Sequence, residues 1–193
     1  MNNYYGRTTS LLSKLLIHQF GLTVFGVLLS TAAAVSGNDS LVLGFSIFSA
    51  LFYLFLLYVL MWDTGASDKI RIDGGRMKRD VFKGLKVTLL ANIPNYVFAV
   101  TSTVSYLCID KTLLDASGNF TTPVWAMNVY MVAQTVGCYL NSMYMGIGDS
   151  IGILTLPIWL FLHTLPALIV CGVGYYLGTR ELFGLPSSGP RRD

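Results

Sequence analysis

Charged residues are scarce in this chain and are missing altogether from four long stretches. Only 12% of the 193 residues are Asp, Glu, Lys or Arg and 53% are hydrophobic, whereas an ordinary soluble domain carries about 25% charged residues. The stretches 15–36, 40–62, 87–109 and 150–179 contain none of the four charged types. Each is long enough to cross roughly 30 Å of hydrocarbon as an α-helix. With no room for a soluble domain between them, the sequence predicts a single all-α integral membrane domain.

Motifs for catalysis, metal binding and cofactor binding are also missing. The three cysteines, Cys108, Cys138 and Cys171, are isolated, and no CxxC or Cys/His cluster of zinc spacing is present. Nor does the chain contain a phosphate-binding GxxxxGK[ST], a GxSxG or an HExxH motif. We therefore expect no metal and no cofactor, and an enzyme is the least favoured class because it would need two convergent reactive groups. A disulfide between Cys108 and Cys138 on the outer side stays open.

The basic residues are distributed in a way that predicts orientation. With four crossings, the N-terminus, the loop 63–86 and the tail 180–193 share one side and hold two, seven and three of the 13 Lys and Arg residues. Only Lys111 lies on the other side. Because Lys and Arg favour the cytoplasmic side, this bias predicts a multi-pass cell-membrane protein with both termini in the cytoplasm. The net charge of +3 is modest and is explained by orientation, so nucleic-acid binding is not expected.

One uncharged segment leaves the number of crossings open. Residues 124–145 lie within the predicted outer segment 110–149 and are long enough to span, but Asn, Gln, Gly and Ser dilute them. A fifth crossing there would carry the three arginines of the tail to the outside. The charge bias thus favours a bundle of four transmembrane helices, with 124–145 lying in the outer interface or dipping in as a re-entrant hairpin. A re-entrant backbone must be hydrogen-bonded by protein or water, which the polar content would serve.

Local signals refine this topology. Pro94 predicts a kink or break within 87–109, because proline removes a backbone donor. Asp-Gly-Gly at 73–75 predicts a turn in the loop 63–86, and the alternating Ile-Arg-Ile before it suits a small hairpin or a turn into a helix. The first stretch ends in small residues, as a cleaved signal peptide does, but its apolar run is longer than such a peptide needs. A retained first helix is therefore expected.

Four polar residues in or beside the apolar stretches are candidate functional residues. His163 lies deep in 150–179, where an ionisable group marks a possible proton or ligand site; the alternative is a neutral histidine bonded to Asn92, Asn95 or a carbonyl freed by Pro166. Asp149 is expected to cap the last helix, or else to contact a cation or substrate at an outer vestibule. Asn92 and Asn95 either bond across helices around the kink or line a path for a solute.

The loop 63–86 supplies a second kind of candidate. Its basic residues would attract anionic lipid at roughly 1 kcal/mol each near the surface, or would dock a cytoplasmic or membrane protein partner. Interleaved acids and a defined turn favour a shaped surface over a simple basic brush. The residues that we assign to docking of a partner or of lipid are Arg71, Arg76, Lys78 and Arg79.

Two functions fit these features. The first is an accessory or subunit-type component of a membrane complex, related to transport, which docks its partner through 63–86. It is motivated by the small bundle, the missing catalytic motifs and the charged loop. The second is a stand-alone transporter or channel for a small solute, acting alone or as a homo-oligomer, which would use the midplane His163. The sequence favours the first slightly.

Overall fold

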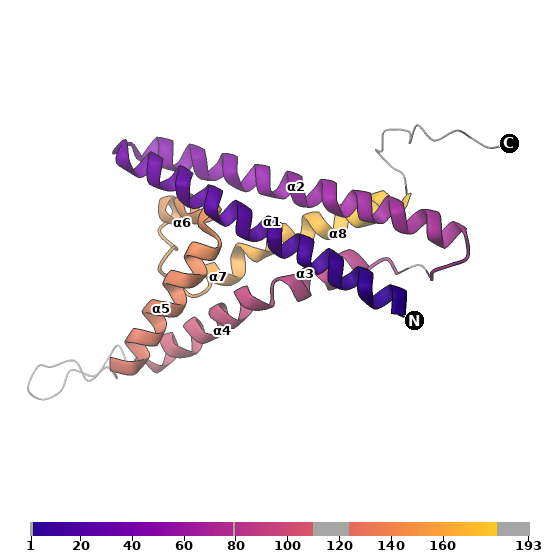
Figure 1. Cartoon of the computed structure of the whole chain (residues 1–193). Helices are drawn as coiled ribbons and strands as arrows, with labels where there is room; N and C mark the ends of the chain where they lie inside the picture. The colour runs from indigo at the N-terminus through magenta and orange to yellow at the C-terminus, as the bar shows by residue number, and fades with distance from the viewer. Residues whose placement is uncertain (1, 79, 110–123, 181–193) are drawn as a thin grey trace, which may run out of the picture.

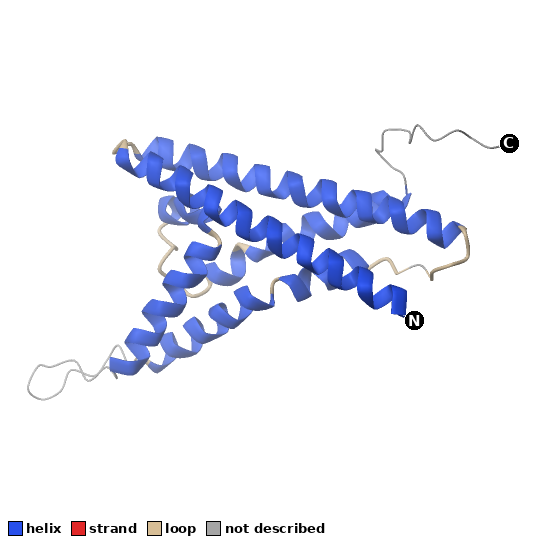
Figure 2. Cartoon of the chain, viewed as in Figure 1, coloured by secondary structure: helices blue, strands red, loops and turns tan. Residues whose placement is uncertain are grey.

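The computed structural model describes residues 2–78, 80–109 and 124–180, and these ranges contain helices and no strand (Figures 1 and 2). The all-α prediction is confirmed. The helices are α1 (Asn2–Val35), α2 (Asp39–Asp73), α3 (Lys83–Ala91), α4 (Ile93–Cys108), α5 (Val124–Leu140), the short 3-10 helix η1 (Ser142–Tyr144), α6 (Met145–Ile151), α7 (Trp159–Leu162) and α8 (Thr164–Arg180).

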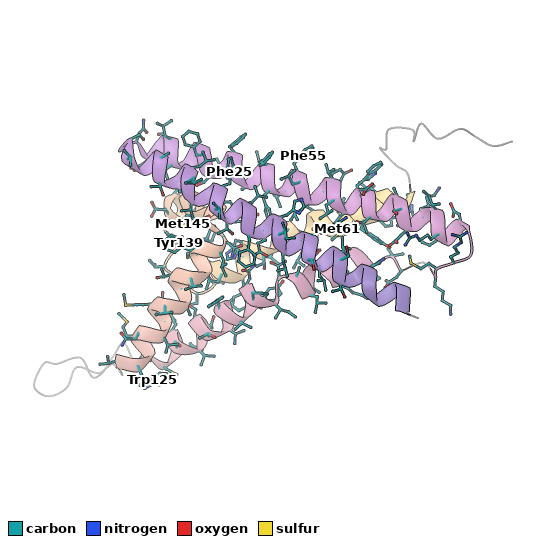
Figure 3. All side chains as sticks on the ribbon, in the orientation of Figure 1. Phe25, Phe55, Met61, Trp125, Tyr139 and Met145 are labelled. Carbon is teal, nitrogen blue, oxygen red and sulfur yellow. The ribbon has the colours of Figure 1, made fainter. Side chains whose placement is uncertain are left out.

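Three helical spans are long and apolar enough to cross a membrane. They are Thr9–Ala32 in α1, Asp39–Asp73 in α2 and Trp159–Arg180 across α7 and α8. The pair α3 and α4 makes a fourth if it counts as one broken span. Large apolar side chains cover the outside of the bundle: Phe55 is 60% exposed, whereas Met61 on the same helix is fully buried (Figure 3). Such a surface suits contact with lipid, and by length and composition these helices are compatible with membrane spans.

Helices α1 and α2 form a long antiparallel hairpin, and α2 is longer than predicted. Gly37 turns the chain in the left-handed region (φ 63°), and the Asn38 side chain caps α2 by accepting a hydrogen bond from Ser40 N at 3.0 Å. Helix α2 then continues through Asp73, where Gly74 and Gly75 end it. The predicted loop 63–86 is therefore wrong over most of its length, since only residues 74–82 connect α2 to α3.

The turn at 73–75 is confirmed, but its surroundings differ from one of the two expectations. Gly75 has φ 68° and its N–H donates to Ile72 O at 3.0 Å. The Ile-Arg-Ile before it is helical, so no hairpin forms there. Residues 63–73 contain no proline, so nothing in this part of the sequence stops α2 before Gly74.

Glycines allow α8 to pack closely against α2 along the bundle. A Cβ added to Gly178 would collide with the backbone of Trp62, and one added to Gly174 would lie 3.0 Å from Tyr58 O. Across the interface, a Cβ on Gly65 would collide with the backbone of Tyr175. The spacing of Gly174 and Gly178 is the small-xxx-small pattern that brings membrane helices into backbone contact.

The predicted break at Pro94 is confirmed, and the chain beyond it forms a seam. Helices α3 and α4 meet at Asn92 with a bend of 56°. Helix α5 then runs antiparallel beside α4 (Figure 1). Three side-chain contacts fix the register of the two helices: Asn95 with Asn141, Ser102 with Gln134, and Tyr106 with Tyr130. From one contact to the next, the position moves forward on α4 by seven and then four residues, and backward on α5 by the same numbers.

The last predicted crossing begins later than expected. Residues 150–151 end α6, the chain turns at Gly152 (φ 74°), and regular helix resumes only at Trp159. Pro157 lies in this irregular stretch and lacks the backbone donor that a helix would use. All three cysteines are free; Cys108 and Cys138 lie near the C-terminal ends of two antiparallel helices, α4 and α5, so the disulfide left open by the sequence is not formed.

The two ends of the bundle differ in content. The charged end, as we name it, carries the start of α1, the 74–82 connection and the end of α8, and the turn end carries the α1–α2 turn and α6 (Figure 1). The predicted tail beyond Arg180 and the segment 110–123 lie outside the described residues. The start of α1 and the end of α8 thus share one end.

Candidate functional site

A buried ion pair joins α2 to α3 at the charged end. Lys83 Nζ lies 2.5 Å from Asp68 Oδ2, and the two residues are 6% and 3% exposed. The Tyr175 hydroxyl on α8 donates to the same carboxylate oxygen at 3.1 Å. Three helices therefore meet at one carboxylate. A charge buried to this degree is tolerated only when it is paired and hydrogen-bonded, and both conditions hold here.

Two glycines, Gly65 and Gly84, make room for this cluster by letting α2 and α3 approach Tyr175 closely. Tyr175 is fully buried between α2 and α3, where a Cβ on Gly84 would lie 2.6 Å from Tyr175 Cβ. Lys83 is the first residue of α3, a position where the helix dipole disfavours a cation. Its placement is therefore explained by Asp68 and not by helix stability.

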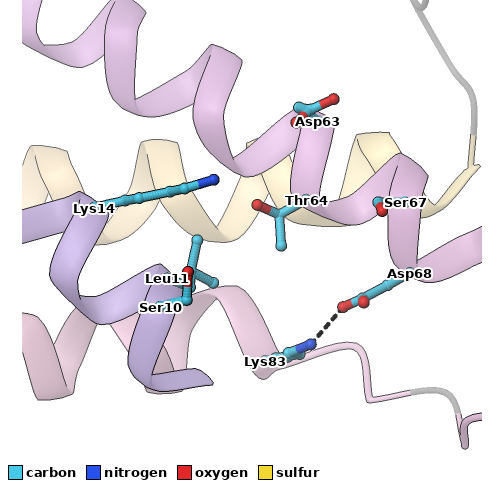
Figure 4. Close-up of a pocket in the computed structure, with 8 residues that line it drawn as sticks. All are labelled: Ser10, Leu11, Lys14, Asp63, Thr64, Ser67, Asp68 and Lys83. Carbon is cyan, nitrogen blue, oxygen red and sulfur yellow. Dashed lines mark hydrogen bonds and ion pairs between the residues drawn. The ribbon is translucent and has the colours of Figure 1, made fainter. Parts of the chain in front are cut away.

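A polar cavity of about 220 Å³ opens beside the ion pair, between α1, α2 and α3 (Figure 4). Two lysines, two aspartates and three hydroxyls line it, with a single apolar residue: Ser10, Leu11, Lys14, Asp63, Thr64, Ser67, Asp68 and Lys83. In Figure 4 the Lys14 side chain extends across the cavity toward α2. Among these described residues, the charges balance formally.

The predicted docking residues lie close to this end. Arg71 is in the last turn of α2 and half-buried, while Arg76 and Lys78 are exposed in the 74–82 connection. Arg79 lies outside the described residues. Asp80 closes the connection: its carboxylate accepts from Phe82 N at 3.1 Å and from Lys86 Nζ at 2.9 Å. The connection is thus held near both of its ends.

His163 is buried, as predicted, but its hydrogen-bond partner differs from those proposed. Its Nδ1 donates to Trp159 O at 2.9 Å, one turn earlier, and not to either asparagine or to a carbonyl freed by Pro166. The ring lies between Tyr144 (6.0 Å between centroids) and Trp159 (6.1 Å). The same Trp159 carbonyl also accepts from the His163 backbone N–H at 3.2 Å, so it serves both the main chain and the ring. Within the described residues, His163 Nε2 and the Tyr144 hydroxyl have no hydrogen-bond partner.

Asn92 and Asn95 are brought together at the break, and α5 joins them. Asn95 Nδ2 donates to Asn92 Oδ1 at 2.9 Å, and Asn141 Nδ2 donates to Asn95 Oδ1 at 3.2 Å. All three residues are buried. The geometry matches the interhelical expectation for these residues, because their amides bond one another around the bend.

Gln134 continues this polar seam and supports the irregular stretch before α7. It accepts from Ser102 Oγ at 2.8 Å and donates from Nε2 to Leu154 O at 2.8 Å. The Tyr130 hydroxyl likewise donates to Thr155 O. Side chains of α5 thus hydrogen-bond carbonyls that no regular helix serves.

Asp149 lies away from these groups. It is exposed, near the C-terminal end of α6, and its backbone carbonyl accepts from Gly152 N at 2.9 Å. The expectation that it caps the last helix is wrong, because that helix begins at Trp159. Asp149 therefore lies at the turn end of the bundle, whereas the Asp68–Lys83 pair lies at the charged end (Figure 1).

Sequence reasoning missed the ion pair and the cavity. It treated 63–86 as a loop and so never asked which of its charges face inward. The stripe of buried residues on α2 continues at helical spacing from Tyr53 through Leu57, Met61 and Gly65 to Asp68. Extending that period past Trp62 would have placed Asp68 in the interior. The small-xxx-small spacing of Gly174 and Gly178, also present in the sequence, predicts that α8 packs closely against another helix.

These features define an all-helical protein with three to four helices suited to crossing a membrane and a charged cluster at one end. No protein-family model, curated protein or solved structure matches the chain.

Proposed function

We propose that this chain is a four-crossing protein of the cell membrane that serves as an accessory or subunit-type component of a transport-related complex, with its charged end in the cytoplasm. Two observations support four crossings. The start of α1 and the end of α8 share one end of the bundle (Figure 1), and α5, of 17 residues, runs back along α4 into an irregular stretch that it hydrogen-bonds itself. That arrangement suits a re-entrant outer segment.

One observation carries the partner role: the charged end presents a held, exposed basic surface. Arg76 N donates to Arg71 O at 2.9 Å, and the Asp80 carboxylate fixes the other side of the connection. Arg76 and Lys78 lie in this connection and are exposed. A surface that is already ordered loses little conformational entropy when a partner binds. By contrast, the deep candidates Asn92 and Asn95 bond each other and Asn141.

Mild-detergent purification after cross-linking in intact membranes tests the partner role. The wild-type chain should bring down a stoichiometric protein, and reversing the exposed charges (Arg76→Glu with Lys78→Glu) should release it. Asp149→Arg, a charge reversal at the turn end, is the matched control and should retain it. A wild-type protein that purifies alone, or a partner that survives the double reversal, contradicts the proposal.

A stand-alone small-solute transporter is the second candidate, and one observation favours it. The unpartnered His163 Nε2 and Tyr144 hydroxyl belong to two rings packed against each other, both buried. In this alternative, flux through vesicles containing only this chain would depend on His163. Loss of flux in His163→Phe, with the fold retained, would establish it.

A further inference from the structure

Two charges in the polar cavity are not joined to each other. Asp68 pairs with Lys83, but among the described ion pairs none involves Lys14 or Asp63. Both of these residues are exposed and both line the cavity. The cavity therefore holds one satisfied pair at its base and one separated cation and anion at its mouth (Figure 4).

The register of the hairpin places these two charges at the same level. Phe25 on α1 contacts Phe52 on α2, with ring centroids 6.0 Å apart. Lys14 precedes Phe25 by eleven residues and Asp63 follows Phe52 by eleven, which is close to three helical turns on each helix. The same register sets Ser10 opposite Ser67. Each charge thus has a serine one turn away on its own helix: Lys14 with Ser10, and Asp63 with Ser67.

We propose that this cavity binds a phosphoethanolamine group, with its phosphate at Lys14 and Ser10 and its ammonium at Asp63 and Ser67. Lysine and a hydroxyl donate to phosphate oxygens, and a carboxylate and a hydroxyl accept from a primary ammonium. A volume of about 220 Å³ is below the roughly 300–1,000 Å³ typical of sites for drug-sized ligands. It therefore suits a small polar group.

The position of the cavity fits a group found at a membrane boundary. Lys14 directly precedes the apolar stretch of α1, and Asp63 directly follows that of α2. The cavity accordingly lies where the apolar surface ends on both helices, at the depth of lipid headgroups. The same group is also available in water as free phosphoethanolamine, so the two sources need separate measurements. The site is independent of the proposed partner surface, because Arg76 and Lys78 do not line it.

The first arm measures binding of free phosphoethanolamine to the purified chain in a nonionic detergent by isothermal titration, with phosphocholine and glycine as comparators. The second arm measures, by native mass spectrometry, retention of phosphatidylethanolamine over phosphatidylcholine from mixed nanodiscs. Binding in the first arm alone identifies a site reached from water, retention in the second alone identifies an interfacial headgroup site, and both together mean that the site takes either source. Each of these three results supports the proposal.

The variants Asp63→Asn and Lys14→Met should each weaken binding by roughly tenfold or more, as loss of a charged hydrogen bond does, with an unchanged melting temperature because both residues are exposed. Asp73→Asn, which removes an exposed acid of α2 outside the cavity, is the matched control and should bind as the wild type does. Absence of binding in both arms, equal binding of the choline compounds, tighter binding of glycine, or insensitivity to both variants would overturn the proposal.

Discussion

Lys83 reaches back fifteen residues along the chain to place its ammonium 2.5 Å from the Asp68 carboxylate, and both side chains are almost completely enclosed. This ion pair links the C-terminal part of α2 to the first residue of α3, and the Tyr175 hydroxyl joins α8 to the same carboxylate. The geometry of the charged end depends on it, because the cavity and the 74–82 connection both adjoin these residues.

Breaking this pair from one side should destabilise the protein strongly. Asp68→Ala or Lys83→Ala leaves the other charge buried and unpaired, and we expect a loss of about 3–5 kcal/mol in the free energy of unfolding. The double variant Asp68→Leu with Lys83→Met should recover much of that loss. Unfolding in mixed micelles, followed by tryptophan fluorescence, measures all three. Lys86→Ala removes one side of the exposed Lys86–Asp80 pair, and its cost should stay below about 1 kcal/mol; equal costs for Lys83→Ala and Lys86→Ala would contradict the burial argument.

Replacing a glycine of α8 by alanine should lower stability at a packed glycine and not at a glycine with free space around it. Gly178→Ala forces a Cβ into the Trp62 backbone, and overpacking of this kind costs about 1–3 kcal/mol. Gly172→Ala lies on the same helix, where the nearest atom to the new Cβ is Leu85 Cδ1 at 3.7 Å. It should be neutral or slightly stabilising, because alanine is the better helix former. Thermal unfolding of the two variants tests this, and a Gly178→Ala protein as stable as Gly172→Ala would show that α2 and α8 are not in backbone contact.

The seam between α4 and α5 should depend on Gln134. Gln134→Leu removes the partner of Ser102 and of the Leu154 carbonyl, and we expect a loss of roughly 1–2 kcal/mol. Asn128→Leu provides the comparison, since Asn128 is an exposed polar residue of the same helix and should tolerate the change. Hydrogen exchange of residues 152–158 should rise in Gln134→Leu only. If exchange there is the same in both variants, Gln134 does not hold that stretch.

Replacing His163 separates the two candidate functions. His163→Ala removes a ring packed between Tyr144 and Trp159, and the cavity should cost roughly 2–5 kcal/mol. His163→Phe keeps a ring there and should recover part of this stability. Under the accessory role, capture of the partner is the same for wild type and His163→Phe, and no flux depends on the histidine. Transport that His163→Phe abolishes in a folded protein would favour the stand-alone transporter instead.

The fold was predictable to the extent that it follows from apolar length and backbone chemistry. The uncharged stretches predicted α1, α2, the α3–α4 pair and α8, Pro94 predicted the break that occurs at Asn92, and Gly74 with Gly75 predicted the turn. The predicted boundaries were wrong where charged residues were taken to form a loop. A helix can continue beyond its apolar span, and α2 does so through Asp73.

The site was less predictable, because it depends on contacts between distant helices. Nothing local to Lys83 says that Asp68 and Tyr175 will meet it. The sequence did indicate that His163 is buried, but it did not indicate that the ring would bond the Trp159 carbonyl four residues earlier. Asp149 was misplaced for the related reason that the irregular stretch after Gly152 delays the last helix.

The number and direction of the crossings are tested most directly by labelling single cysteines in intact cells with a membrane-impermeant maleimide. In a background without Cys108, Cys138 and Cys171, cysteine is placed at three positions: Ser36 in the α1–α2 turn, Asp149 in α6, and Arg76 in the 74–82 connection. Four crossings with a cytoplasmic charged end predict that positions 36 and 149 are labelled from outside and that position 76 is labelled only after the cells are opened. Protection of position 149 together with position 76, while position 36 is labelled, would mean that α5 crosses the membrane and would contradict the account.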